Sequence, residues 1–173
     1  MSYNIVWASP SEAWNKDLPP IGFSVNSSGT AMTVSKFPEP DYYLRMARPP
    51  RGVLEFVVKA YRSVKHDHNT LKSLIHDFCE ESGIVCDMSK TTTTELGGVA
   101  RRSREFLTGR NLSRKKWSAA LIPSPDGGPY GLLVLFGAYV GPHKSGKAEA
   151  IMERPVLKRL KESFQLTNSR LSG

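Results

Sequence analysis

The sequence predicts an α+β fold: a small antiparallel sheet with helices packed on one face, preceded by a Pro-rich N-terminal arm. Three patterns support this prediction. Apolar residues alternate with polar ones in residues 53–64, they recur at helical spacing in residues 71–79, and a Gly-containing turn separates two apolar runs in residues 117–140. Strands and helices that occupy separate stretches of a chain in this way are typical of the α+β class.

The arm is predicted from its prolines. Residues 1–50 hold 7 of the 12 prolines and show no sustained apolar periodicity, and proline interrupts regular strand pairing. We therefore expect an extended, partly disordered arm in residues 1–50. A basic globular domain in residues 51–166 is expected to fold without it, and residues 167–173 are expected to form a flexible tail.

Two tryptophans indicate a role for the arm. Ser9 and Glu12 have the spacing of a capping box, which predicts a short helix carrying Trp14. Trp7 precedes that helix. Exposed aromatic residues are good anchors in interfaces, so we predict that Trp7 and Trp14 mediate self-association.

The globular domain is predicted to begin with a strand and a helix. Residues 53–64 alternate as in a strand with one exposed face. Residues 69–81 begin with a capping residue and continue with apolar residues on one helical face, and Gly83 ends the helix. Phe56 and Val58 of the strand are expected to pack against the helix residues Leu74, Ile75 and Phe78.

The second half of the domain is predicted to contain two further helices and a hairpin. Thr94 is expected to cap a helix over residues 95–108, in which Gly97 and Gly98 weaken the first turn by about 1 kcal/mol each. Strands are predicted over 117–122 and 130–140, joined by a turn at Asp126-Gly127. A final helix is expected over residues 149–166, with Pro155 near its start.

Cysteine usage and hydropathy indicate a soluble protein from a reducing compartment. Cys79 and Cys86 are too few for a disulfide framework, and Cys79 falls on the apolar side of the first helix, so a buried free thiol is expected. The N-terminus has neither a basic leader nor a long apolar run. The longest apolar stretch, residues 131–140, is shorter than the roughly 20 residues that a bilayer requires.

Positive charge is concentrated in the last part of the chain. Residues 101–173 carry 14 Lys and Arg against 5 Asp and Glu, whereas residues 1–100 carry 10 against 11. Charge of one sign favours a polyanionic partner, either nucleic acid or an anionic membrane surface. Trp117 follows the densest cluster and is expected to lie in the core. The predicted polyanion-binding residues are Arg101, Arg102, Arg104, Arg110, Arg114, Lys115 and Lys116.

Two other motifs are weighed against simpler explanations. Residues 141–148 fit the spacing G-x-x-x-x-G-K of a phosphate-binding loop, but Ala148 stands where the Mg²⁺-binding hydroxyl is needed, so a flexible basic loop is the preferred interpretation. His66, His68 and His76 form a weak metal-ligand pattern, and a strand-to-helix turn is the preferred explanation of the same residues. We therefore expect no enzyme activity, no cofactor and no metal.

The chain resembles the matrix proteins of rhabdoviruses, especially the shorter ones of plant-infecting members. The resemblance covers roughly residues 38–141. It rests on a Pro-rich arm followed by a basic domain, and on the strand VLEFVVKAYRSVKH with the helix NTLKSLIHDFCEES, after which a second helix and two strands follow in similar order. The resemblance implies a structural protein that coats the viral nucleocapsid or RNA, self-associates and contacts an anionic membrane.

This resemblance also implies a location: the virion and the host cytoplasm, at the periphery of the membrane, or the host nucleus. Two alternatives remain open from the residues alone. One is a nucleic-acid-binding protein or silencing suppressor that uses the same basic segment. The other is a nucleotide-binding protein that uses residues 141–148.

Overall fold

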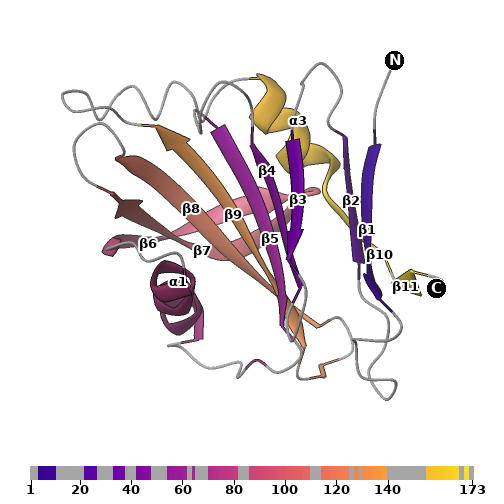
Figure 1. Ribbon diagram of the computed structural model, residues 1–173, viewed down its shortest axis with the longest axis horizontal. Helices are drawn as coiled ribbons and strands as arrows, with labels where there is room; N and C mark the ends of the chain where they lie inside the picture. The colour runs from indigo at the N-terminus through magenta and orange to yellow at the C-terminus, as the bar shows by residue number, and fades with distance from the viewer. Residues whose placement is uncertain are drawn as a thin grey trace.

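The structure, a computed structural model, contains two β-sheets and two helices in its described part (Figure 1). The described residues are 4–10, 22–26, 33–37, 42–47, 54–61, 64, 70–81, 86–109, 114–124, 127–128, 130–139, 155–167 and 170–171.

The larger sheet has seven strands in the order β3-β4-β5-β9-β8-β7-β6, and each neighbouring pair is antiparallel. These strands are β3 (Thr33–Phe37), β4 (Tyr42–Ala47), β5 (Leu54–Tyr61), β6 (Cys86–Leu96), β7 (Val99–Thr108), β8 (Lys115–Pro123) and β9 (Gly131–Tyr139). The smaller sheet has the order β10-β2-β1-β11. Its strands are β1 (Asn4–Pro10), β2 (Gly22–Asn26), β10 (Gln165–Thr167) and β11 (Arg170–Leu171), and the helices are α1 (Thr70–Glu81) and α3 (Pro155–Ser163).

Each face of the larger sheet carries a buried apolar cluster, because successive side chains of a strand point to opposite sides. We call one side the α1 face: there Val57, Phe106, Trp117, Ala119, Leu133 and Leu135 form a buried cluster with the apolar side of α1. We call the other side the α3 face: there Phe56, Val58, Ala120, Ile122, Leu132, Val134 and Phe136 pack with Phe23 and Val25 of β2, with Leu160 of α3 and with Phe164. The α+β prediction, with helices on one face, is therefore wrong, since the described chain is mostly β and its two helices cover opposite faces.

The N-terminal segment contributes strands to both sheets. β1 and β2 pair with each other and β2 also pairs with β10, while β3 and β4 extend the larger sheet from β5. The Pro-rich arm of the fold prediction is thus corrected, because its prolines lie at or between strand ends and leave the pairing runs intact. The short helix expected to carry Trp14 begins where β1 is observed instead, and Trp14 itself lies outside the described residues.

The first predicted helix is confirmed, but its packing partner is not the expected one. Leu71, Leu74, Ile75, Phe78 and Cys79 are buried, as their spacing predicts. α1 lies on the face that carries Val57, whereas Phe56 and Val58 point to the α3 face. The strand is also buried on both sides, since even Glu55 and Lys59 are inaccessible. The prediction of a half-exposed strand is therefore wrong.

The second predicted helix is a β-hairpin. β6 and β7 pair from Leu96–Val99 at the turn to Cys86–Thr108 at the far end. Gly97 and Gly98 form the two-residue turn with φ of 61° and 81°. Both values are positive, as a type I′ hairpin turn requires, and Gly-Gly satisfies this at low steric cost. The glycines that weaken a helix at this position are the ones that make the hairpin.

The predicted hairpin of residues 117–122 and 130–140 is confirmed. β8 and β9 pair along their full lengths, from Lys115–Tyr139 to Pro123–Gly131. Trp117 is buried, as expected, and its ring fills the space above its cross-strand partner Gly137, where a Cβ would come within 2.7 Å of the indole. The indole Nε1 donates a hydrogen bond of 2.8 Å to the hydroxyl of Thr108.

The final helix ends earlier than predicted, at Ser163, and residues 149–154 of the prediction lie outside the described residues. α3 begins at Pro155, in agreement with the preference of proline for a first helical position, and the chain returns to strand at Gln165. The turn of the β6–β7 hairpin contacts its C-terminal end, where the Gly97 N–H donates to the Lys161 carbonyl at 2.8 Å.

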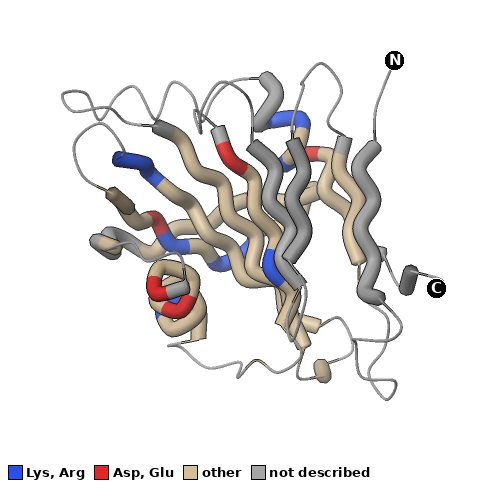
Figure 2. The backbone as a smooth tube through the Cα atoms, viewed as in Figure 1, with Lys and Arg blue, Asp and Glu red and all other residues tan. Residues whose placement is uncertain are grey.

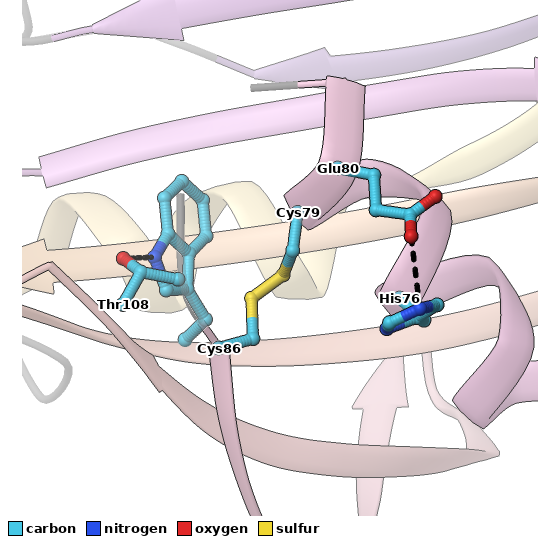
Figure 3. Close-up of a disulfide and its surroundings, with 6 residues drawn as sticks. His76, Cys79, Glu80, Cys86 and Thr108 are labelled. Atoms are coloured by element: carbon cyan, nitrogen blue, oxygen red, sulfur yellow. Dashed lines mark hydrogen bonds and ion pairs between the residues drawn. A yellow bond between two sulfur atoms is a disulfide. The ribbon is translucent and has the colours of Figure 1, made fainter. Parts of the chain in front are cut away.

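Cys79 is buried, but it is not a free thiol. It forms a disulfide with Cys86, which joins α1 to the start of β6 (Figure 3). The two Cα atoms are 6.1 Å apart, within the usual range for a disulfide. The expected free thiol is therefore corrected, and the expected reducing compartment stays a prediction.

The two sides of α1 should respond differently to truncation. Phe78→Ala should lower the free energy of unfolding by about 3–5 kcal/mol, because it removes a buried ring that contacts Phe106 and Trp117 edge to face. Lys72→Ala, on the exposed side, should change it by less than about 0.5 kcal/mol. Urea titrations followed by circular dichroism measure both, and a larger loss for Lys72→Ala would contradict the observed helix orientation.

Candidate functional site

The seven predicted polyanion-binding residues do not form one cluster. Arg101, Arg102 and Arg104 lie on β7, Lys115 and Lys116 begin β8, and Arg114 precedes β8 and is exposed. Arg110 lies outside the described residues. Figure 2 shows the basic residues of β7 and β8 at separate places along the two strands. The alternation of the strands divides them further: Arg102, Arg104 and Lys115 are on the α1 face, and Arg101 and Lys116 are on the α3 face.

Two of these cations are used inside the protein. Lys115 Nζ donates to the carboxylate of Glu55 at 2.9 Å, and the Glu55 side chain is 2% exposed. Lys116 Nζ lies 3.9 Å from a carboxylate oxygen of Glu105. A buried carboxylate needs a charged or hydrogen-bonding partner, so the role of Lys115 in this structure is to stabilise the fold. Sequence spacing could not show this, because Glu55 is 60 residues away.

Arg101 lies beside a network of hydroxyl groups on the α3 face. The hydroxyl of buried Ser103 is 2.6 Å from that of Thr92 and 2.9 Å from that of Thr94, which in turn is 3.4 Å from that of Ser118. These bonds connect β6, β7 and β8 across the sheet. Arg101 is half-buried and its Nε has no hydrogen-bond partner in the described structure.

The exposed part of the α1 face carries the remaining cations. Arg102 is paired with Thr93 and Arg104 with Thr91 in the register of the hairpin. Arg102, Thr91 and Thr93 are exposed and Arg104 is half-buried, with its Nε buried and lacking a hydrogen-bond partner. We call these four residues the hairpin strip. The threonines were not among the predicted site residues, although the run Thr91–Thr94 of β-branched residues could have indicated a strand.

The hairpin strip is not neutralised within the described part of the chain. No ion pair there joins a carboxylate to Arg102 or Arg104. Glu95 is on the same face, nearer the turn, and is exposed. Helix α1, which lies on the same face, contacts β7 and β8 and has its own exposed pair, His76 with Glu80 at 3.1 Å (Figure 3). The strip is thus a polar, cationic surface on a regular hairpin.

The cations of α3 are a second basic surface, on the other side of the sheet. Lys158 is exposed, and Lys161 lies 5.1 Å from the ring centre of Phe136. Burial lowers the pKa of Lys161 below its usual value. Lys161 packs over a core ring and belongs to the α3 face of the sheet. Lys158 is therefore the more exposed of these two α3 lysines.

The other predicted sites are mostly outside the described structure. Residues 141–148, His66 and His68 are not described, and Trp7 is described only as part of the β1 backbone. Among the described residues, no group of His, Cys, Asp and Glu is placed to hold a metal ion. The described helices include none with both the length and the hydrophobicity needed to cross a membrane.

Comparison with known proteins found no matching family model and no matching curated protein.

Proposed function

We propose that this protein binds nucleic acid through the hairpin strip, by contacts to phosphates rather than to bases. The observation that carries the proposal is the pair Arg102 and Arg104 on one sheet face, beside the hydroxyls of Thr91 and Thr93 and without a carboxylate partner in the described chain. Arginine forms paired hydrogen bonds with phosphate oxygens, and threonine hydroxyls are common additional donors to phosphate. The excess charge of residues 101–173 supports the same partner class.

The surroundings of the strip favour nucleic acid over a lipid surface. Proteins that lie in a membrane interface insert apolar side chains next to their cations. Among the described residues, Val99 is the exposed large apolar side chain, at 48% exposure, and it points to the α3 face. The strip itself presents hydroxyl and guanidinium groups, which suit a phosphate backbone.

A matrix-type role stays a second candidate. A matrix-type protein needs a basic surface, which agrees with the charge distribution of the chain. It also needs to self-associate, and the open sheet edge described below is the observation that favours this. However, residues 95–108, where the resemblance implies a second helix, form the end of β6, the Gly97-Gly98 turn and β7. Nucleotide binding by residues 141–148 stays an untested alternative, since these residues lie outside the described structure.

Removing the two arginines should weaken binding and reduce its salt dependence. For Arg102→Gln/Arg104→Gln, the slope of log K against log salt concentration should decrease by about 1.8 for duplex DNA and about 1.4 for single-stranded RNA, if each arginine contacts one phosphate. Affinity should fall similarly for different sequences, because phosphate contacts carry no sequence information. Fluorescence anisotropy at several salt concentrations gives the slope.

The matched control is Lys72→Gln/Lys158→Gln, which removes the same charge from exposed positions on α1 and α3. It should bind with nearly the wild-type slope. Equal slopes for both double variants would contradict the assignment of the strip. Co-sedimentation with anionic vesicles, measured in parallel, distinguishes the matrix-type role, which requires vesicle binding as well.

A further inference from the structure

The outer edge of β6 is open in the described structure. β6 is the last strand of the larger sheet, and no described strand pairs with its outer side. Its regular segment runs from Thr91, after a register shift that begins at Met88, to the turn at Gly97. Exposed edges are usually protected by lysine, proline or a bulge. The register shift and Lys90 lie just before this segment. Between Thr91 and Leu96 the sequence, T-T-T-T-E-L, has neither lysine nor proline, and the pairing with β7 is regular.

We propose that two copies of this chain associate through β6, pairing antiparallel to join their larger sheets. A second copy suits this edge because the segment is complementary to itself. β-branched residues favour strands, and threonine pairs across neighbouring strands are stabilising. The inference does not rest on nucleic-acid binding, because its test measures association of the protein alone. The two proposals share Arg104: in the dimer it would meet Glu95 of the second copy, which leaves Arg102 as the unpaired cation of the hairpin strip in the described chain.

Symmetry restricts the register. A two-fold axis that relates two antiparallel edge strands is normal to the sheet, so each face continues as the same face in the second copy. Two residues that pair must then lie on the same face of β6, so their numbers differ by an even number. The axis therefore passes between one residue and its own copy. An axis at Thr93 uses the whole segment between the register shift and the turn: Thr93 meets Thr93, Thr92 meets Thr94, and Thr91 meets Glu95 of the second copy.

This register brings opposite charges together. Arg104 is the cross-strand neighbour of Thr91 within one chain. Glu95 of the second copy would lie on the same face, two strand spacings from Arg104, or about 10 Å between Cα atoms. Extended arginine and glutamate side chains span that distance over the short side chain of Thr91. The pairing would occur twice, and it gives a carboxylate to an arginine that has none in the described chain.

Charge exchange tests the interface by analytical ultracentrifugation of the full chain. Wild type should form a concentration-dependent dimer. Glu95→Arg and Arg104→Glu should each weaken it by about tenfold or more, because each places like charges together, and the combination Glu95→Arg/Arg104→Glu should restore it. Within one chain these positions are too far apart to pair, since Glu95 is opposite Ala100, so recovery requires a second copy. A monomeric wild type, or a dimer insensitive to both single variants, overturns the proposal.

Cross-linking tests the register. Thr93→Cys should be linked to its copy by a short bismaleimide, since the two residues meet at the axis. Thr91→Cys is the matched control, because it is also exposed on the same face but lies about 14 Å from its copy along the strands. Covalent dimers from Thr93→Cys and few from Thr91→Cys support the register. Covalent dimers from Thr91→Cys alone, or from neither variant, overturn it.

Discussion

Phe23→Ala should lower the free energy of unfolding by about 3–5 kcal/mol. This is a large loss for a residue in residues 1–50, the segment whose prolines predict a dispensable arm. The Phe23 ring is fully buried. It stacks on Phe164 with ring centres 5.5 Å apart and meets Phe56 edge to face at 6.2 Å. Its removal leaves a cavity where the smaller sheet, the larger sheet and the end of α3 meet. Urea unfolding followed by circular dichroism gives the value.

The neighbouring residue provides the control. Ser24→Ala, a half-buried position of the same strand, should change the free energy by less than about 0.5 kcal/mol. A chain that begins at Arg51 lacks β1 to β4 and should lose cooperative unfolding, since the α3 face would lose Phe23 and Val25. Cooperative unfolding of that shortened chain, or a neutral Phe23→Ala, would instead support an independent domain in residues 51–166.

Gly97→Ala should be much more damaging than Gly98→Ala. Both glycines have positive φ, so alanine costs about 1–2 kcal/mol at either position. A Cβ on Gly98 meets nothing within 4 Å, whereas a Cβ on Gly97 would overlap the backbone oxygen of Phe164. Forcing that contact apart also strains the hydrogen bond from Gly97 to Lys161. We expect Gly97→Ala to lower the free energy of unfolding by about 1–3 kcal/mol more than Gly98→Ala does.

Thermal unfolding of the two variants side by side measures this difference. The comparison is informative because both variants place alanine at a positive φ. That cost is similar in the two variants and cancels when their stabilities are subtracted. Equal destabilisation would indicate that the turn does not contact the end of α3. It would leave the hairpin itself intact, because both glycines would still be needed for the turn.

The hairpin shows why sequence periodicity failed in residues 86–108. Leu96, Val99, Ala100, Ser103 and Phe106 fit a helical spacing, but two of them, Val99 and Ala100, are exposed in the structure. The local signals that favoured strands were the run of four threonines and the Gly-Gly pair. A helix that tolerates two glycines in its first turn was the weaker interpretation. Helix α1, which has no competing turn signal, was predicted correctly.

Long-range pairing accounts for the other differences. Glu55 appeared to mark an exposed strand face, yet it is buried because Lys115 reaches it from another strand. The strands of residues 1–50 are short, and Phe23 is buried only because Phe56 and Phe164 surround it. Neither partner is visible from local sequence. In the same way, the basic residues were identified from composition, but strand alternation decided which of them share a face.

The position of Trp117 gives the molecule an internal optical reporter. Its indole lies in a buried cluster against Phe78 and Phe106, and its Nε1 donates a hydrogen bond to Thr108. Of the three tryptophans in the chain, the other two are Trp7 and Trp14. With those two replaced by phenylalanine, the emission wavelength follows hydration beneath α1 alone. Detachment of that helix could then be timed separately from disruption of the opposite side of the sheet.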